Sequence, residues 1–264
     1  MLRSRILAVV LLLGVCGSSL AAVRGEEVSY RHGDVVMKGY IAWDDAVSGR
    51  RPGVLVVHEW WGHDEYARRR ARMLAALGYT ALAVDMYGSG KKADHPKDAG
   101  QFSSEVRKNL PMMTARFKAA KKLLSIHPAV DARRVAAIGY CFGGSVVLEM
   151  ARQGDDLSAI VSFHGNLTTQ NPAKAGVVRA KVLVLNGAAD PMINPLAVQA
   201  FVQEMRNAKA DFRVVTYPGA KHAFTNPEAT AYGTKFAIPL AYNARADRES
   251  WEEMKGFLAS AFRE

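Results

Sequence analysis

The sequence predicts a single α/β domain with a mostly parallel sheet and helices on both faces. Three observations lead to this fold class. Short apolar runs such as Val54–Val57 lack the alternation of a half-exposed strand, as expected where both faces are covered. These runs alternate with segments of helical spacing, which indicates right-handed crossovers between parallel strands. The chain has 264 residues, of which 49% are hydrophobic and 23% charged, and this suits one globular domain over residues 26–264.

The first strands of the domain are expected to differ from the others. Residues 28–43 alternate apolar and polar side chains around His32-Gly33-Asp34, and this pattern predicts a β-hairpin. The parallel strands should follow the hairpin. We expect them at residues 54–57, 81–84, 135–138, 159–161, 182–185 and 212–215.

Segments of helical spacing separate these strands. We expect helices at residues 64–77, 102–125, 143–152, 195–208 and 247–262. Gly78 should end the first of them, and Pro111 should kink or divide the second. Residues 225–246 are rich in aromatic and small side chains and indicate a long loop that could cap a site.

The N-terminal segment indicates where the protein acts. Arg3 and Arg5 precede an apolar run at residues 6–15, and small residues follow. This order is typical of a secretory signal peptide, here residues 1–21, and the run is too short to span a bilayer. We expect an exported protein, periplasmic or secreted, with no membrane association once the signal is removed. The alternatives are an uncleaved membrane anchor and, less favoured because Val15 is bulky, a lipoprotein modified at Cys16.

The charge balance does not indicate a nucleic-acid partner. The chain has 35 Lys and Arg against 25 Asp and Glu, a net charge of +10, but the cations are spread along the sequence. No nucleic-acid-binding motif accompanies them, so solvated helix faces explain them best. No two histidines have metal-ligand spacing. We therefore expect a monomer with a small-molecule substrate, without a metal or other cofactor.

The segment Gly139-Tyr140-Cys141-Phe142-Gly143-Gly144 lies directly between a predicted strand and a predicted helix. Small residues around a nucleophile allow the sharp turn that lifts its side chain above a sheet. The helix that follows directs its N-terminal amides at that side chain, which favours a thiolate. Cys141 is thus the candidate nucleophile, and the N–H of Phe142 is a candidate oxyanion donor. A buried structural cysteine is the alternative.

A thiol nucleophile needs a base and a group that orients the base. Asp190 follows the predicted strand at 182–185, and His222 follows the one at 212–215. Both lie just past carboxyl ends of strands, where the crevice of an open α/β sheet forms. Each residue alone could be an ordinary turn residue. Together, in the order nucleophile, acid, histidine, they predict a catalytic triad with Cys141.

The segment His58-Glu59-Trp60-Trp61-Gly62 follows the first buried parallel strand. The N–H of Trp60 is the candidate second oxyanion donor, because such loops supply one in α/β-hydrolases. Glu59 would place a carboxylate beside the thiol, although it could instead favour the start of the next helix. The residues that could line a substrate site are Trp61, Tyr87, His164 and Phe224.

The chain resembles the dienelactone hydrolase family. The motifs that carry the resemblance are Glu59-x-x-x-Gly, Gly-x-Cys141-x-Gly-Gly, and the later Asp190 and His222. The resemblance implies an α/β-hydrolase fold with Cys141 as nucleophile, His222 as base and Asp190 orienting the base. It further implies that Glu59 pairs with the resting thiol and is displaced when substrate binds.

The resemblance does not extend to the substrate. In bacterial members that open dienelactones, two arginines hold the substrate's carboxylate, whereas Ser89 and Asn226 stand near those positions here. The sequence therefore predicts a hydrolase that cleaves an ester or lactone through an acyl-thioester on Cys141. The alternative is a non-catalytic binding protein on the same fold.

Overall fold

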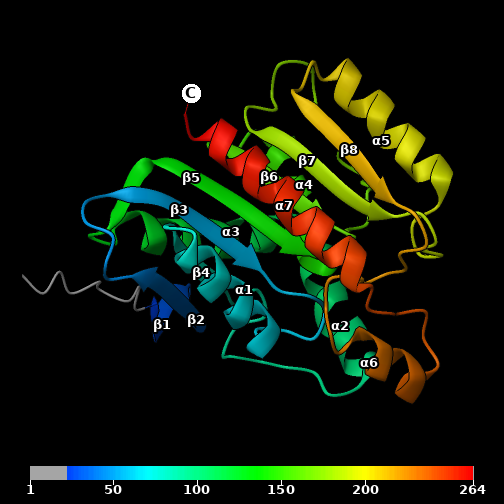
Figure 1. Ribbon diagram of the computed structural model, residues 1–264, viewed down its shortest axis with the longest axis horizontal. Helices are drawn as coiled ribbons and strands as arrows, with labels where there is room; N and C mark the ends of the chain where they lie inside the picture. The colour runs from blue at the N-terminus through cyan, green and yellow to red at the C-terminus, as the bar shows by residue number, and fades with distance from the viewer. Residues whose placement is uncertain (1–22, 264) are drawn as a thin grey trace, which may run out of the picture.

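The protein folds around one eight-stranded sheet (Figure 1). The computed structural model describes residues 23–263, so the expected signal peptide at residues 1–21 lies outside the described residues. The strand order is β1-β2-β4-β3-β5-β6-β7-β8. The strands are β1 (Val23–His32), β2 (Val35–Asp44), β3 (Arg51–Val57), β4 (Thr80–Val84), β5 (Val130–Tyr140), β6 (Ala159–Phe163), β7 (Lys181–Gly187) and β8 (Phe212–Tyr217).

The first two strands form the predicted antiparallel hairpin, which turns at Gly33 with φ 56°. Glycine adopts this left-handed conformation at low cost. Strand β2 also pairs antiparallel with β4, and the neighbouring pairs from β4 through β3 to β8 are all parallel. The mostly parallel sheet predicted from the apolar runs is confirmed.

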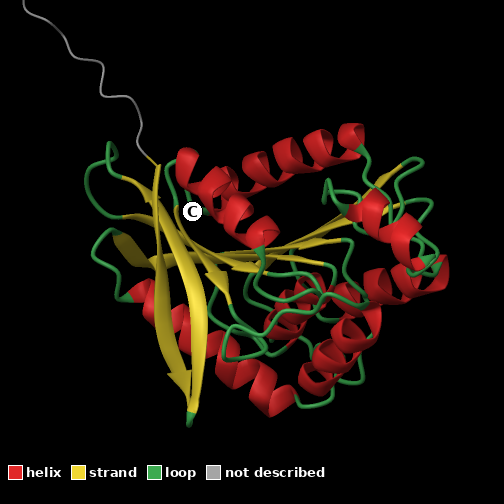
Figure 2. Cartoon of the chain, turned by 90° about the horizontal axis from the view of Figure 1, so that it is seen from below, coloured by secondary structure: helices red, strands yellow, loops and turns green. Residues whose placement is uncertain are grey.

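Helices cover both faces of the sheet (Figure 2). They are α1 (Glu65–Ala76), α2 (Pro96–Arg107), α3 (Leu110–Ser125), α4 (Phe142–Arg152), α5 (Pro195–Asn207), α6 (Ala229–Phe236) and α7 (Ala244–Ala261). None of the helices in the described part of the chain is long and apolar enough to cross a bilayer.

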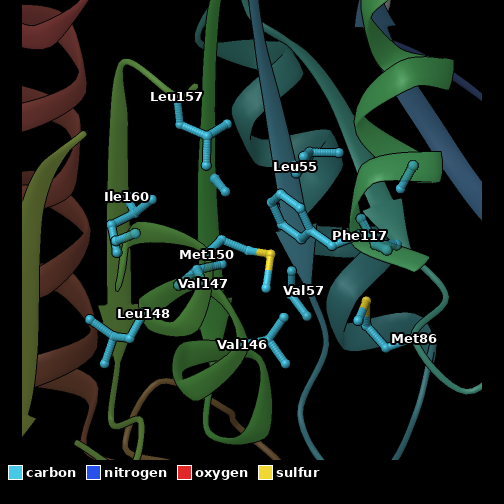
Figure 3. Close-up of a cluster of buried hydrophobic side chains, with 14 of the residues drawn as sticks. Leu55, Val57, Met86, Phe117, Val146, Val147, Leu148, Met150, Leu157 and Ile160 are labelled. Carbon is cyan, nitrogen blue, oxygen red and sulfur yellow. The ribbon is translucent and has the colours of Figure 1, made fainter. Parts of the chain in front are cut away.

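Strand β3 shows why its residues form a run without a polar face. Val54 and Val56 pack in one core cluster together with residues of α1 and α7. Leu55 and Val57 point to the other face and join a second cluster with residues of α3 and α4 (Figure 3). Successive side chains of a strand point to opposite faces, so a strand covered on both sides must be apolar throughout.

Two sequence expectations need correction, the loop at 225–246 and the start of the last helix. The expected division of the helix at 102–125 is confirmed, because Asn109 caps a new helix and Pro111 lies in its first turn. Proline is well tolerated there, since the first N–H groups of a helix have no partner within it. The expected loop at 225–246 contains α6, whose residue Phe236 contacts His95 at the start of α2. The last helix begins at Ala244 rather than at Asp247.

Candidate active site

The candidate residues converge because the strands that precede them are parallel. Glu59, Cys141, His164, Asp190 and His222 follow β3, β5, β6, β7 and β8 within a few residues. The carboxyl ends of parallel strands lie at the same edge of a sheet, so loops far apart in the sequence meet there.

Cys141 occupies a sharp turn between β5 and α4. Its backbone has φ 51° and ψ −111°, a conformation that costs a residue with a side chain about 1–3 kcal/mol. Close packing around the turn maintains it. A Cβ atom at Gly139 would lie 2.1 Å from the carbonyl oxygen of Gly143, and one at Gly143 would lie 2.2 Å from that of Val57. Any larger residue at Gly139 or Gly143 would clash with the backbone, so both positions require glycine.

His222 connects Cys141 with Asp190. Its Nε2 atom lies 3.1 Å from the Sγ atom of Cys141, and its Nδ1 atom lies 2.7 Å from the Oδ2 atom of Asp190. Asp190 Oδ1 accepts the backbone N–H of Met192, which fixes the carboxylate. The imidazole and the carboxylate are buried, whereas Cys141 is partly exposed. The arrangement places a base within reach of a thiol that small molecules can approach.

Two neighbouring groups, at Cys141 and Asp190, determine the direction in which the pKa of His222 shifts. Burial alone would lower the pKa of its imidazole, because it penalises the charged form. The Cys141 sulfur and the Asp190 carboxylate outweigh burial and raise that pKa to about 10. Contact with these two groups therefore favours the imidazolium form of His222.

Glu59 makes no hydrogen bond to the thiol among the described residues. Its Oε2 atom accepts a 2.6 Å hydrogen bond from Nδ2 of Asn226, and no hydrogen bond joins Glu59 to Cys141 among the described residues. Glu59 is 2% exposed, and burial raises the pKa of its carboxyl to about 7 against the opposing hydrogen bond from Asn226. The structure thus pairs the sulfur with His222, where the family resemblance implied Glu59.

Two of the expected lining residues lie inside the protein instead. His164 and Phe224 are fully buried, with their rings 5.2 Å apart. His164 Nδ1 accepts the backbone N–H of Cys141 at 3.1 Å, and its Nε2 atom lies 2.7 Å from the hydroxyl of Thr225. Both ring nitrogens are occupied by protein groups, so His164 supports the turn from below rather than facing a substrate.

The two candidate oxyanion segments are joined directly. The backbone N–H of Gly143 donates to the carbonyl of His58 at 3.1 Å, which links the start of α4 to the loop after β3. In that loop the carbonyl of Trp60 accepts the hydroxyl of Tyr87 at 2.9 Å. Phe142 is the first residue of α4, and the first amides of a helix have no partner within it.

Trp61 and Tyr87, the other expected lining residues, are 3% and 5% exposed. Trp61 packs against Tyr232 and Phe236 of α6, with ring centroids 4.6 and 6.1 Å apart. Residues 225–246 were expected to form a loop that caps the site. They instead contain helix α6, which packs over Trp61.

No cluster of three or more His, Cys, Asp or Glu side chains suited to a metal ion occurs within residues 23–263.

The dienelactone hydrolase family model matches residues 37–262. The chain belongs to this family. It is therefore a dienelactone hydrolase-like enzyme of the ester and lactone hydrolase class with an α/β-hydrolase fold. The match covers the sheet from β2 onward together with all seven described helices.

Solved structures and curated relatives agree with the family. A crystal structure of a dienelactone hydrolase-like promiscuous phosphotriesterase from metagenomic libraries superposes with a TM-score of 0.86 at 38% identity, covering 91% of this chain and 99% of that one. A protein of Salmonella typhimurium that carries the name carboxymethylenebutenolidase is 31% identical, over 84% of this chain and 82% of its own length. The Aquifex pyrophilus "Protein usf" is 30% identical, over 76% of this chain and 87% of its own length.

Sequence reasoning missed two residues of this dienelactone hydrolase-like site. The sequence marks Asn226 only as a position without arginine, yet its side chain holds Glu59. No sequence pattern singles out Thr225, although its hydroxyl lies within hydrogen-bond distance of both His164 and Tyr66. The only sequence feature that could have indicated a role for these two residues is their position directly after His222-Ala223-Phe224. Their partners Glu59, His164 and Tyr66 lie after β3, after β6 and in α1, so only the fold could identify the contacts.

Proposed function

We propose that the protein hydrolyses an ester or lactone through an acyl-thioester on Cys141. The observation that carries the proposal is the position of His222, between the Cys141 sulfur at 3.1 Å and the Asp190 carboxylate at 2.7 Å. A base in contact with a thiol and oriented by a carboxylate is the arrangement that activates a nucleophile.

The first chemical step forms the thioester. His222 holds the proton of the thiol, and the Cys141 sulfur attacks the carbonyl carbon of the substrate. The carbonyl π electrons move to oxygen to give a tetrahedral intermediate. When the intermediate collapses, the bond to the alcohol oxygen breaks and His222 donates its proton to that oxygen. Asp190 keeps the imidazole in the required orientation throughout.

Backbone amides stabilise the oxyanion in this proposal. The donors are the N–H groups of Phe142 and Trp60, from the two segments that the hydrogen bond between Gly143 and His58 holds together. Tyr87 fixes the Trp60 peptide through its carbonyl. Removing one such donor in other hydrolases costs about 2.7–4 kcal/mol of transition-state stabilisation.

The second step restores the enzyme. Water loses a proton to His222 and attacks the thioester carbonyl, and the carbon–sulfur bond breaks to release the acid. The sulfur then leaves as a thiolate beside the imidazolium, the pairing that the raised pKa of His222 favours.

Substitution of Cys141 tests the proposed nucleophile. Cys141→Ala should reduce turnover of a small activated ester such as p-nitrophenyl acetate by about 10³-fold or more, because no attacking atom remains. Ser48→Ala, at an exposed position between β2 and β3, is the control and should hydrolyse the ester at the original rate. Trapping of the acylated peptide by mass spectrometry checks the intermediate. Retained activity in Cys141→Ala would refute the mechanism.

A phosphotriester is a second candidate substrate. The structure that superposes with a TM-score of 0.86 is titled a promiscuous phosphotriesterase. The same sulfur could attack phosphorus and expel an aryloxide that departs as its phenol. Parallel assays of p-nitrophenyl acetate and diethyl p-nitrophenyl phosphate compare the two candidate substrates. If no p-nitrophenol is released from the phosphate, phosphotriesters are not substrates.

The non-catalytic alternative predicts an inert thiol. An activated Cys141 should react with iodoacetamide at mildly acidic pH far faster than a free cysteine, whereas a structural cysteine should react more slowly. We also propose export through the N-terminal segment. Cell fractionation with residues 1–21 present or deleted tests that part, and cytoplasmic retention of the intact chain would contradict it.

A further inference from the structure

Thr225 is a fully buried residue in the same segment as His222, three positions further along the chain. Its hydroxyl oxygen lies 2.7 Å from Nε2 of His164 and 2.6 Å from the hydroxyl of Tyr66. Its backbone carbonyl accepts from Nη2 of Arg70 at 2.7 Å. These contacts join the segment that carries the candidate base to the loop after β6 and to helix α1.

His164 continues the connection to the candidate nucleophile. The backbone N–H of Cys141 donates to Nδ1 of His164 at 3.1 Å and also to the carbonyl of Phe163 at 3.0 Å. Cys141 and His164 both have a positive φ, of 51° and 40°. Residues with a side chain keep such a backbone conformation only where the surrounding contacts maintain it. The imidazole of His164 supplies one of these contacts.

The contacts of His164 assign its ring proton. A backbone N–H can only donate, so Nδ1 accepts from Cys141 and the proton lies on Nε2. The ring is fully buried, and a buried N–H without an acceptor is costly. The Thr225 hydroxyl provides that acceptor. Without it, the proton would be left unpaired or would move to Nδ1, where it would face the amide of Cys141.

Helix α1 holds Thr225 from the other side. Nε of Arg70 donates to the hydroxyl of Tyr66 at 3.3 Å, and the guanidinium carbon lies 5.2 Å from the centroid of the Tyr66 ring. Arg70 is 2% exposed and forms an ion pair with Asp247 of α7. The groups that contact the hydroxyl and the carbonyl of Thr225 are thus themselves fixed by neighbouring elements.

We propose that Thr225 is a positioning residue that keeps the ring proton of His164 on Nε2, so that Nδ1 can hold the backbone amide of Cys141 and orient the sulfur toward His222. The inference rests on the proposed function of Cys141 as nucleophile. Thr225 acts through His164 and not on the substrate. Because Thr225 and His222 belong to one segment, the same hydroxyl also fixes the base relative to the turn that carries Cys141.

The tautomer of His164 tests the inference directly. In protein labelled with ¹⁵N-histidine, long-range ¹H–¹⁵N correlation spectra distinguish a protonated ring nitrogen from an unprotonated one. The signals of His164 are identified by their absence in His164→Phe. We expect a protonated Nε2 and an unprotonated Nδ1. A ring protonated at Nδ1 would overturn the inference, and this result does not depend on whether any variant of Thr225 folds.

Replacement of the hydroxyl extends this test. Thr225→Val keeps the shape of the side chain and removes the acceptor, so the two ring nitrogens of His164 should show shifts averaged between the tautomers. The variant should also lower kcat for p-nitrophenyl acetate by about fivefold with KM nearly unchanged, because the sulfur is less well oriented. Thr225→Ser should keep the original tautomer and recover kcat to within about twofold. Thr216→Val, at an exposed position of β8, is the matched control and should keep the original kcat.

A double variant shows whether Thr225 acts through His164. Added to His164→Phe, Thr225→Val should lower kcat further by less than about twofold, because the ring that it positions is already absent. Three results would overturn the inference: an unchanged kcat in Thr225→Val, equal losses in Thr225→Val and Thr225→Ser, or a further fivefold loss in the double variant.

Failure of this inference is distinguishable from failure of the proposed function. Retained ester hydrolysis in Cys141→Ala would reject Cys141 as the nucleophile. The tautomer of His164 is measured on the free protein without any assay of activity. Loss of activity in Cys141→Ala together with a ring protonated at Nδ1 would reject the positioning role of Thr225 alone.

Discussion

The loops after β6 and β8 each place a buried histidine beside Cys141, and the two imidazoles differ in charge. Their ring centroids are 5.4 Å apart in an edge-on arrangement. His222 contacts the sulfur and the Asp190 carboxylate, which raise its pKa to about 10. His164 is fully buried and near the positive charges of His222 and Arg70, so its pKa falls well below the ordinary value.

The difference shows that the partners of a buried imidazole, and not burial alone, determine its charge. A backbone N–H can only donate, so the contact with Cys141 makes Nδ1 of His164 an acceptor and leaves the ring proton on Nε2, facing Thr225. His164 is thus a neutral support. His222 has acceptors at both nitrogens and is suited to hold and move a proton.

Removal of His222, the proposed proton carrier, should have the largest effect. His222→Ala should lower kcat/KM for an activated ester by about 10³-fold or more, because neither thiol activation nor leaving-group protonation remains. Steady-state kinetics with a p-nitrophenyl ester measure this loss in kcat/KM. His32→Ala, at the hairpin turn of β1 and β2, is the control and should change kcat/KM by less than about twofold. If His222→Ala retained most of its activity, His222 would not carry the proton, and the proposed difference in role between His222 and His164 would be wrong.

Removal of the neutral support should have a smaller effect. His164→Phe leaves the Cys141 amide without its imidazole acceptor, although the carbonyl of Phe163 still accepts from that amide at 3.0 Å. We expect kcat to fall by about tenfold with KM nearly unchanged, because the nucleophile is less well oriented. Single-turnover kinetics should place the loss in the acylation step.

The conservative variant His164→Asn distinguishes orientation from loss of packing. An asparagine oxygen can take the place of Nδ1 as an acceptor, so this variant should recover most of the lost kcat. Equal losses in His164→Phe and His164→Asn would mean that the hydrogen bond to Cys141 does not matter.

The smallest expected effect is on the pH dependence of stability. In the folded protein the pKa of His164 is lowered, so its imidazole stays neutral as the pH falls. In the unfolded chain the same imidazole takes up a proton below about pH 6.5. The free energy of unfolding therefore decreases as the pH falls below that value. His164→Phe should reduce the loss between pH 7.5 and pH 5 by about 1–2 kcal/mol. Urea unfolding at both pH values measures it. An unchanged loss would show that His164 is not held neutral.

Much of the fold followed from the sequence because strand burial leaves a local pattern. The runs around Val54 and Val182 have no polar face since both sides of the sheet are covered, and the structure confirms both strands. The division at Pro111 was also foreseeable. Helix α6 was not, because its short segment is stabilised by packing of Tyr232 and Phe236 on Trp61, a residue distant in the sequence.

The sequence by itself determined the sheet, the turn that carries Cys141 and the order of Asp190 and His222, because glycine spacing and strand ends are local features. Only the tertiary structure decided that Asn226 holds Glu59 and that His164 lies beneath Cys141. Those contacts join loops from different strands. Their existence depends on distances across the sheet edge, which no spacing along the chain encodes.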